Sequence, residues 1–186
     1  MMNLKLIKVN TIYKSFSKQI IKNIFIDDCM QKILSIVFEK DAFTFFKNIF
    51  KDKSLQIDIT ITNNKYITLL NKKWMNKNTP TDVLSFPLHQ FHNNQINEFN
   101  EFNELFLGDI IISYEYLINY CSFNKINKHK HFLRLLSHGF LHLLGFDHSN
   151  QDDAKEMFNL ENIILKPLIK GSGLTINFFQ SQIKEY

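Results

Sequence analysis

Three histidines in the last third of the chain, His138, His142 and His148, have the spacing of a metal site. His138 and His142 are four residues apart, so on a helix they lie one turn apart on the same face. Gly145 follows three residues later, where it can end the helix and let the chain turn back with His148. Three neutral imidazoles can hold a catalytic metal ion and leave a fourth position for water. The spacing therefore predicts a metal site on a helix and the turn that follows it.

Zinc is the metal that this ligand set favours, because three histidines form a complete protein set for a catalytic zinc ion. Imidazole also binds nickel, copper and iron, so the residues alone do not fix the metal. A zinc ion with an open position lowers the pKa of water toward neutrality and polarises a phosphoryl oxygen. Such a site is compatible with hydrolysis of RNA, of a small phosphoester or of an amide.

The spacing His-x3-His-x2-Gly-x2-His also occurs in the metzincin proteases. Those enzymes carry a glutamate general base directly after the first histidine, whereas this chain has Gly139. A peptidase without that carboxylate lacks the group that activates its water. A metallopeptidase is therefore the less favoured interpretation, and cleavage of a protein substrate would distinguish it.

Periodicity and capping residues predict the elements that carry the histidines. Asn127 is a helix N-cap, and the helix that it starts runs from about Lys128 to Leu144. The next helix starts near residues 151–153, where two aspartates suit its first turn, and ends at about Leu165 before Pro167. The three histidines thus belong to one helix and to the connection between two helices.

Upstream of this region, strands and helices alternate. The pattern predicts strands at 55–61, 83–86 and 106–113, and helices at 41–50, 64–74 and 114–120. Pro87 makes 83–86 an edge strand or its end, and residues 89–103 lack a clean period and indicate a surface loop. Residues 19–26 and 32–38 fit a strand or a helix equally well. One sheet mixed with helices indicates an α+β or α/β fold.

Composition bounds the protein class. The 186 residues suit one domain, and 45% hydrophobic with 22% charged residues exclude a disordered or fibrous protein. The net charge of +4, from 22 basic and 18 acidic residues, suits a polyanionic partner without requiring one. No apolar run approaches the ~20 residues of a membrane span, and the first 17 residues lack an export signal. Cys29 and Cys121 are far apart and form no CxxC arrangement, which indicates neither a disulfide framework nor a cysteine zinc site. We therefore expect two buried thiols and a location in the reducing cytoplasm.

Four blocks of sequence resemble the YbeY family of bacterial endoribonucleases, the rRNA maturation factors. The blocks are Asn71–Pro87, Leu107–Ile110, His138–His148 and Glu156–Glu161. Their order and separations fit the family, and the resemblance covers roughly residues 55–168, with 1–54 outside it. It implies a single α+β domain over residues 1–186, with one mixed, mostly parallel four-stranded sheet flanked by helices.

The resemblance also implies a function. A zinc ion would be held by His138, His142 and His148, and the protein would cleave single-stranded RNA in a metal-dependent reaction. The family acts in 3′-end maturation of small-subunit (16S) rRNA and in ribosome quality control. The expected partners are single-stranded RNA, the small ribosomal subunit and its assembly factors, with no membrane involved.

One position departs from the family. The helix after the second strand usually ends in an aromatic residue followed by an arginine linked to activity, but here Trp74 is followed by Met75. A thioether cannot neutralise a phosphate. Arg134, the chain's sole arginine, lies one turn before His138 and is a candidate replacement, with a solvated helix charge as its alternative. Asp147, beside the last histidine, is either a general base or a structural support for a ligand or the turn.

Met75 motivates a second interpretation, a zinc-containing ribosome-assembly factor with weak or no nuclease activity. Six of the lysines between residues 47 and 77, with Trp74 among them, predict either a basic surface with a stacking platform for RNA or ordinary solvated faces; they are residues 47, 51, 53, 72, 73 and 77. The histidines outside the motif are expected to be exposed, namely His89, His92, His129 and His131.

Overall fold

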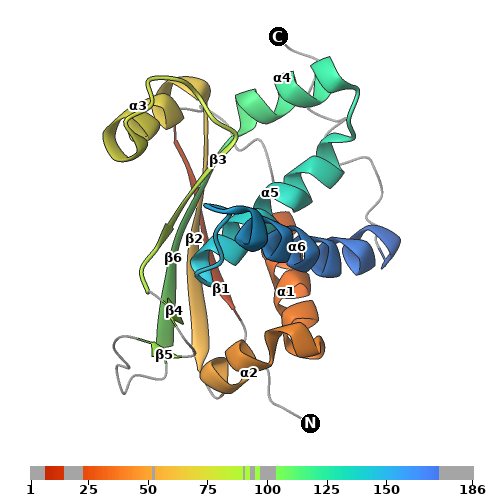
Figure 1. Ribbon diagram of the computed structural model, residues 1–186. Coiled ribbons are helices and arrows are strands. Elements are labelled where there is room, and N and C mark those ends of the chain that lie inside the picture. The colour runs from red at the N-terminus through yellow and green to blue at the C-terminus, as the bar shows by residue number, and fades with distance from the viewer. Residues whose placement is uncertain are drawn as a thin grey trace.

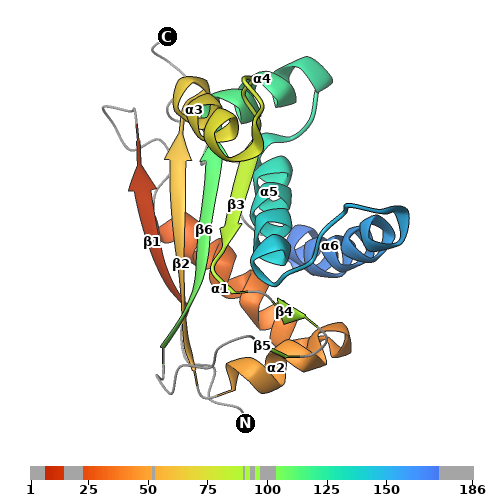
Figure 2. The same cartoon turned by 60° about the vertical axis from the view of Figure 1, so that its left-hand side comes forward.

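The structure, a computed structural model, describes residues 7–14, 23–51, 53–89, 91–92, 95–96 and 104–171. A four-stranded sheet runs through it (Figures 1 and 2). The strand order is β1 (Lys8–Tyr13), β2 (Ser54–Thr62), β6 (Glu104–Ser113) and β3 (Val83–Pro87). β1 and β6 run parallel to β2, whereas β3 pairs with β6 antiparallel. The sheet is mixed and mostly parallel, as predicted, and β3 is an edge strand.

The helices are distributed around the sheet in three groups. α1 (Asn23–Glu39), α5 (Lys128–Leu143) and α6 (Gln151–Gly171) lie on one side of it (Figure 1). α2 (Thr44–Phe50), preceded by a 3₁₀ turn at Asp41–Phe43, lies at one end of the sheet. α3 (Asn64–Met75) and α4 (Tyr114–Asn124) lie at the other end. None of the described helices is long and apolar enough to cross a membrane.

Two hydrophobic cores follow from the period of two along each strand. Ile57, Ile59 and Ile61 of β2 are fully buried on the face toward α1, α5 and α6, where the large core lies. A small core lies on the opposite face, where Ile67 of α3 packs with Leu84 and Ile111. The sheet therefore has packed helices on both faces, and α5 is fixed against β3 and β6.

The ends of α5 follow the predicted local signals. Asn127 is the N-cap, and its side-chain oxygen accepts a hydrogen bond from the Lys130 backbone N–H at 3.0 Å. At the other end Gly145 has a φ of 87°, and its backbone N–H donates to the His142 carbonyl at 2.9 Å. This left-handed turn ends the helix where the sequence predicts.

Three segments of the chain differ from the sequence predictions or decide between two of them. Within the segment 89–103, predicted as a loop, β4 (Phe91–His92) and β5 (Gln95–Ile96) pair antiparallel. The sequence does not reveal them, because two-residue strands leave no readable period. Residues 90, 93–94 and 97–103 lie outside the described part of the chain. α1 is one helix across residues 23–26 and 32–38 of the two segments that fit a strand or a helix equally well, and residues 19–22 lie outside the described part of the chain. β1 was not predicted, since its six residues, half-buried and exposed, have no strong alternation.

α6 also runs further than predicted. It passes through Pro167 and ends at Gly171, not at Leu165. Proline removes one helix hydrogen bond, but Ile164 and Leu168 on either side of it are buried in the large core. Packing of these two side chains holds the last turns in helical form.

Candidate metal centre

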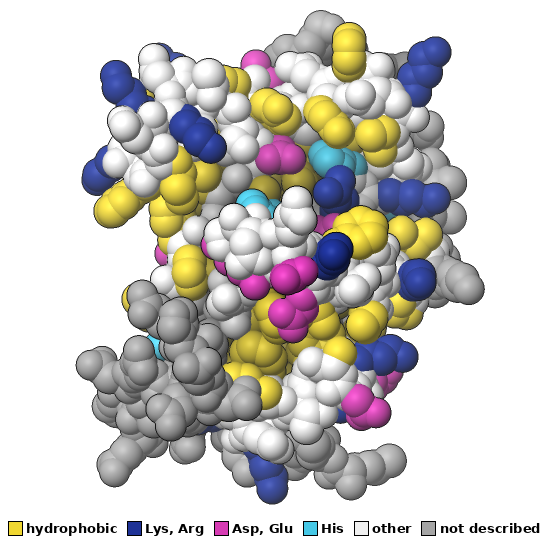
Figure 3. Space-filling view, viewed as in Figure 1, with side chains coloured by type: hydrophobic (Ala, Val, Ile, Leu, Met, Phe, Trp, Pro, Cys, Tyr) yellow, Lys and Arg dark blue, Asp and Glu magenta, His cyan; other side chains and the backbone are white. Residues whose placement is uncertain are grey.

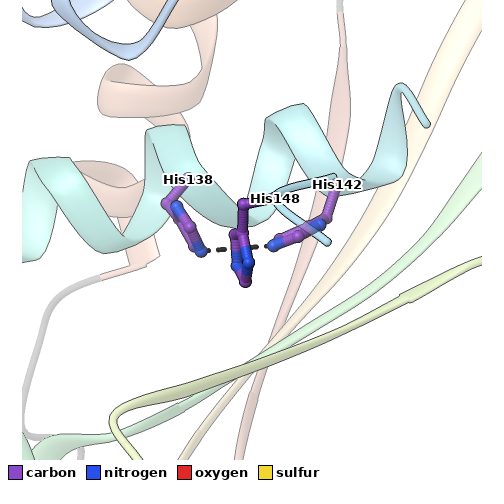
Figure 4. A group of neighbouring side chains, drawn as sticks. All are labelled: His138, His142 and His148. Carbon is purple, nitrogen blue, oxygen red and sulfur yellow. Dashed lines mark hydrogen bonds between the residues drawn. The ribbon is translucent and has the colours of Figure 1, made fainter. Parts of the chain in front are cut away.

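The three histidines converge at the C-terminal end of α5. His138 and His142 project from the same face of the helix, and the turn at Gly145 brings His148 beside them (Figure 4). One ring nitrogen from each residue lies within 4.8 Å of the other two. The Nε2 atoms of His138 and His142 are 3.2 Å apart. The three side chains could therefore hold one metal ion, as the spacing predicts.

The site is accessible from solvent. His148 is exposed, whereas His138 and His142 are half-buried. Figure 3 shows histidine side chains at the surface of one face of the molecule, with acidic and basic side chains close to them. Partial burial of His138 and His142 on α5 and exposure of His148 suit a site that must admit a ligand from outside.

The environment of His142 keeps its ring neutral. Burial lowers the pKa of His142 to about 4, and the nearby His138 and His148 rings act in the same direction. The Asp147 carboxylate opposes this shift. At neutral pH the His142 ring is therefore unprotonated, which a metal ligand requires.

Behind the histidines lies a buried carboxylate, Glu161 of α6. Its side chain is only 7% exposed, and its Oε1 atom accepts a hydrogen bond from Nδ1 of His138 at 3.0 Å. Its Oε2 atom accepts a hydrogen bond from Nε of Arg134 at 3.3 Å. Burial raises the pKa of Glu161, but the His138 hydrogen bond and the Arg134 charge outweigh it, so the pKa falls below its usual value.

Sequence reasoning included Glu161 in a family block but gave it no role. The available signal was an acid within the apolar face of a helix, next to Leu160 and one turn from Met157 and Ile164. A charged residue in such a stripe is rarely buried unless it is paired. Its partners could not be identified, because they lie on a different helix.

The two candidate catalytic residues occupy different environments. The Arg134 side chain is 53% exposed and is held through Nε by Glu161, on the same helix face as His138. Asp147 is exposed, and its carboxylate forms no hydrogen bond or ion pair with any residue in the described part of the chain. Arg134 thus has a fixed partner beside the histidines, whereas Asp147 faces solvent.

Gly139 occupies the position of the metzincin glutamate and has no space for a side chain. It is buried, and a Cβ atom there would lie 2.9 Å from Cγ2 of Ile110 and 3.1 Å from Oγ of Ser85. The position therefore faces β6 and β3. A glutamate at 139 would collide with the sheet, which argues further against a peptidase of that type.

The prediction that the other histidines are exposed is wrong for those whose side chains are described. His131 is buried, because it faces α4 and stacks on Tyr120 with ring centroids 4.9 Å apart. His129 and His89 are half-buried, the first against Phe25 and the second within 2.8 Å of the Phe106 carbonyl oxygen. The side chain of His92 lies outside the described part of the structure.

The six lysines of the predicted basic surface do not form one surface. Lys72 and Lys73 are on α3, with Lys73 Nζ 4.9 Å from the centre of the exposed Trp74 ring. Lys47 is on α2, at the opposite end of the sheet, and forms an ion pair with Asp41 at 3.7 Å. Only the α3 group combines positive charge with an exposed aromatic ring.

Comparison with known proteins places these features in a family. The family model described as Endoribonuclease YbeY matches residues 13–169. An Endoribonuclease YbeY of Prochlorococcus marinus (strain MIT 9312) is 35% identical, with 86% of each chain covered. That of Sulfurihydrogenibium sp. is 38% identical, with 82% of this chain and 87% of its own covered. That of Pelagibacter ubique is 39% identical, with 66% of this chain and 82% of its own covered.

A solved structure shares the fold. A solution structure from Thermotoga maritima superimposes with a TM-score of 0.51 and 16% sequence identity. The alignment covers 90% of this chain and 95% of that one. At this identity the similarity shows a common architecture, and the functional argument comes from the closer relatives.

Proposed function

The chain belongs to the YbeY endoribonuclease family, and we propose that it is a zinc-dependent endoribonuclease that cleaves single-stranded RNA. We propose further that it acts in the cytoplasm on the 3′ end of 16S rRNA and in ribosome quality control, with the small subunit and its assembly factors as partners. The observation that carries the proposal is the convergence of His138, His142 and His148 within 4.8 Å.

The residues present fit a zinc ion. Three imidazole nitrogens lie within 4.8 Å of one another, His142 is neutral at physiological pH, and His138 is supported by a carboxylate. A zinc ion held there supplies a Lewis acid that polarises a phosphoryl oxygen and lowers the pKa of water. The protein contributes the fixed orientation of its three ligands and an approach from the solvent side.

Two charged side chains complete the proposed site. Arg134 replaces the arginine that the family carries at the position of Met75, because its guanidinium lies beside His138 and can pair with a phosphate. Asp147 accepts the proton of the attacking water or RNA 2′-hydroxyl, because it adjoins His148 and its carboxylate faces solvent. The attacking oxygen then bonds to phosphorus, one P–O ester bond breaks, and the leaving oxygen takes a proton from solvent water. The substitution Asp147→Asn tests this role, with Asp152→Asn, an exposed acid of α6, as the matched control.

A second candidate function is a ribosome-assembly factor that retains the metal and has little hydrolytic activity. Met75 favours it, since this side chain is 45% exposed at the end of α3 and carries no charge. The two functions differ in one outcome, the fate of RNA incubated with metal-loaded protein.

The deciding experiment is cleavage of a single-stranded RNA fragment from the 3′ end of 16S rRNA by protein of known zinc content. We expect cleavage by the wild type and none by His142→Ala or by the chelated protein. His129→Ala is the matched control, because His129 is on the same helix but packs against Phe25. Intact RNA with fully zinc-loaded wild type, together with tight binding to the small subunit, would select the assembly factor.

A further inference from the structure

The buried carboxylate of Glu161 touches both functional groups of α5. Its Oε1 atom lies 3.0 Å from Nδ1 of His138, and its Oε2 atom lies 3.3 Å from Nε of Arg134. The side chain is 7% exposed, so water cannot replace these partners at little cost. One carboxylate of α6 therefore ties together two side chains that are one helical turn apart on α5.

The hydrogen bond to His138 determines which of its ring nitrogens is available. An ionised carboxylate only accepts hydrogen bonds, so Nδ1 of His138 must carry the proton that it donates to Oε1. The other nitrogen, Nε2, is then unprotonated. This is the atom that lies 3.2 Å from Nε2 of His142, where the three ligand atoms converge. Glu161 thus fixes both the tautomer and the orientation of a ligand.

The bond to Arg134 leaves its terminal groups available. Glu161 uses only Nε, and the two Nη groups form no hydrogen bond with any residue that the structure describes. With 53% of the side chain exposed, these amino groups can reach an anion from solvent. Because Arg134 and His138 share one carboxylate, the guanidinium is held at a fixed place beside the ligand.

We propose that Glu161 is the positioning residue of the site: it holds His138 in the ligand tautomer and holds Arg134 beside it for the RNA phosphate. The inference rests on the proposed function, which supplies the metal and the substrate. Glutamine has the same shape as glutamate but is neutral and has one acceptor oxygen in place of two, so Glu161→Gln removes the negative charge behind the His138 ring and loses one of the two hydrogen bonds.

The first test measures the His138 tautomer in metal-free protein by ¹⁵N NMR of the imidazole nitrogens. We expect the Nδ1–H form in the wild type. In Glu161→Ala the proton should move to Nε2, where the Nε2 atom of His142 can accept it. An Nε2–H ring in the wild type, or the same tautomer in both proteins, overturns the proposal.

The second test measures affinity for Zn²⁺ by competition with a chelator. We expect Glu161→Gln to bind Zn²⁺ about 10- to 100-fold more weakly than the wild type. Glu156→Gln is the matched control, because Glu156 is an exposed acid on the same helix, and it should bind as the wild type does. Arg134→Met should keep its Zn²⁺ affinity close to that of the wild type while its kcat for RNA falls.

The outcomes separate this proposal from the proposed function. Equal Zn²⁺ affinity in Glu161→Gln and Glu156→Gln, with wild type that cleaves RNA, contradicts positioning by Glu161 and leaves the nuclease intact. Weakened Zn²⁺ binding in Glu161→Gln, with wild type that leaves RNA uncut, supports positioning and rejects the nuclease. Circular dichroism checks that the variants fold. If the Glu161→Gln protein does not fold, the His138 tautomer of the wild type alone decides whether the proposal holds.

Discussion

Arg134 is the chain's sole arginine, and its guanidinium has one fixed partner and one open side. An arginine can bind a phosphate with two parallel hydrogen bonds, which a lysine cannot reproduce. Its positive charge can stabilise the negative charge that develops in the transition state of phosphodiester cleavage.

We therefore expect Arg134→Met to lower kcat for RNA cleavage by about 100-fold or more, the typical cost of removing one electrostatic stabiliser. Arg134→Lys should recover only part of that loss. Single-turnover cleavage of the rRNA fragment by zinc-loaded protein measures the effect. Lys130→Met serves as control, because Lys130 is an exposed cation one turn away on the same helix. Equal rates for the Arg134→Met and Lys130→Met proteins would remove Arg134 from the reaction.

The two cysteines are a second feature at the scale of single residues. Both are buried, and burial raises the pKa of Cys29 to about 12 and raises that of Cys121. A thiol that is both protonated and inaccessible does not react as a nucleophile. The confirmed burial of both side chains agrees with the prediction from their spacing.

At pH 8 we expect a thiol reagent such as dithionitrobenzoate to label neither cysteine in the native protein and both after unfolding in guanidinium. The native state keeps the Cys29 thiol proton, whereas the unfolded chain releases it above about pH 9. The free energy of unfolding should therefore fall as the pH rises from 9 toward 12. Rapid labelling of one thiol under native conditions would contradict the burial.

Among the elements, β6 depends on a bulge. The register between β2 and β6 shifts at Gln56 and Ile57, so that Leu107 has no partner on β2 and Gly108 pairs with Ile57. Gly108 has a φ of 132°, and a Cβ atom there would lie 2.2 Å from the Phe86 carbonyl oxygen of β3. Only glycine fits this backbone conformation and this close approach.

Gly108→Ala should therefore lower the free energy of unfolding by about 2 kcal/mol or more, from the strained φ and the contact with β3. Urea denaturation followed by circular dichroism measures the change. Glu104→Ala, at an exposed position of the same strand, should change stability little. A Gly108→Ala protein as stable as the wild type would show that β3 can move away from β6 at no cost.

Elements whose limits depend on nearby residues could be predicted from the sequence. Asn127 and Gly145 form hydrogen bonds with backbone groups within four residues of themselves. Both ends of α5 could therefore be predicted, and so could the positions of His138 and His142 on it. The convergence of the three histidines in the structure has the same local origin.

Features that depend on distant pairing could not be predicted. β1 is held beside β2 by contacts such as the 2.8 Å hydrogen bond from Asn10 to Asp58, 48 residues away. The role of Glu161 depends on the packing of α6 against α5, which no pattern within either helix reveals. The extension of α6 through Pro167 likewise comes from tertiary burial, which outweighs the local preference of proline.

For the whole molecule, metal binding should be linked to folding. His138 and His142 come from α5 and His148 from the connection to α6, so a shared ion would join the two helices. A ligand that binds only the native state stabilises it by about 2.7 kcal/mol at 100 times its Kd. For a chain of this length that corresponds to a rise in Tm of roughly 5 to 10 °C.

We expect this rise when Zn²⁺ is added to metal-free wild type, and its reversal by a chelator, in a thermal melt followed by circular dichroism. His142→Ala should show no rise at the same Zn²⁺ concentration, whereas His129→Ala should respond as the wild type does. A Tm of the wild type that ignores Zn²⁺ would mean that the ion is not held by the folded site.

The position of Glu161 on α6 also has a consequence for synthesis. His138 lies 23 residues before Glu161 along the chain, so the ribosome makes the proposed ligands before the carboxylate that is proposed to orient one of them. Domains generally fold as units during synthesis, and the proposed metal site needs α6 to be translated, released from the exit tunnel and docked on α5. A nascent chain therefore lacks a finished centre until translation has passed α6, which delays its nuclease activity while it is still attached to the ribosome that makes it.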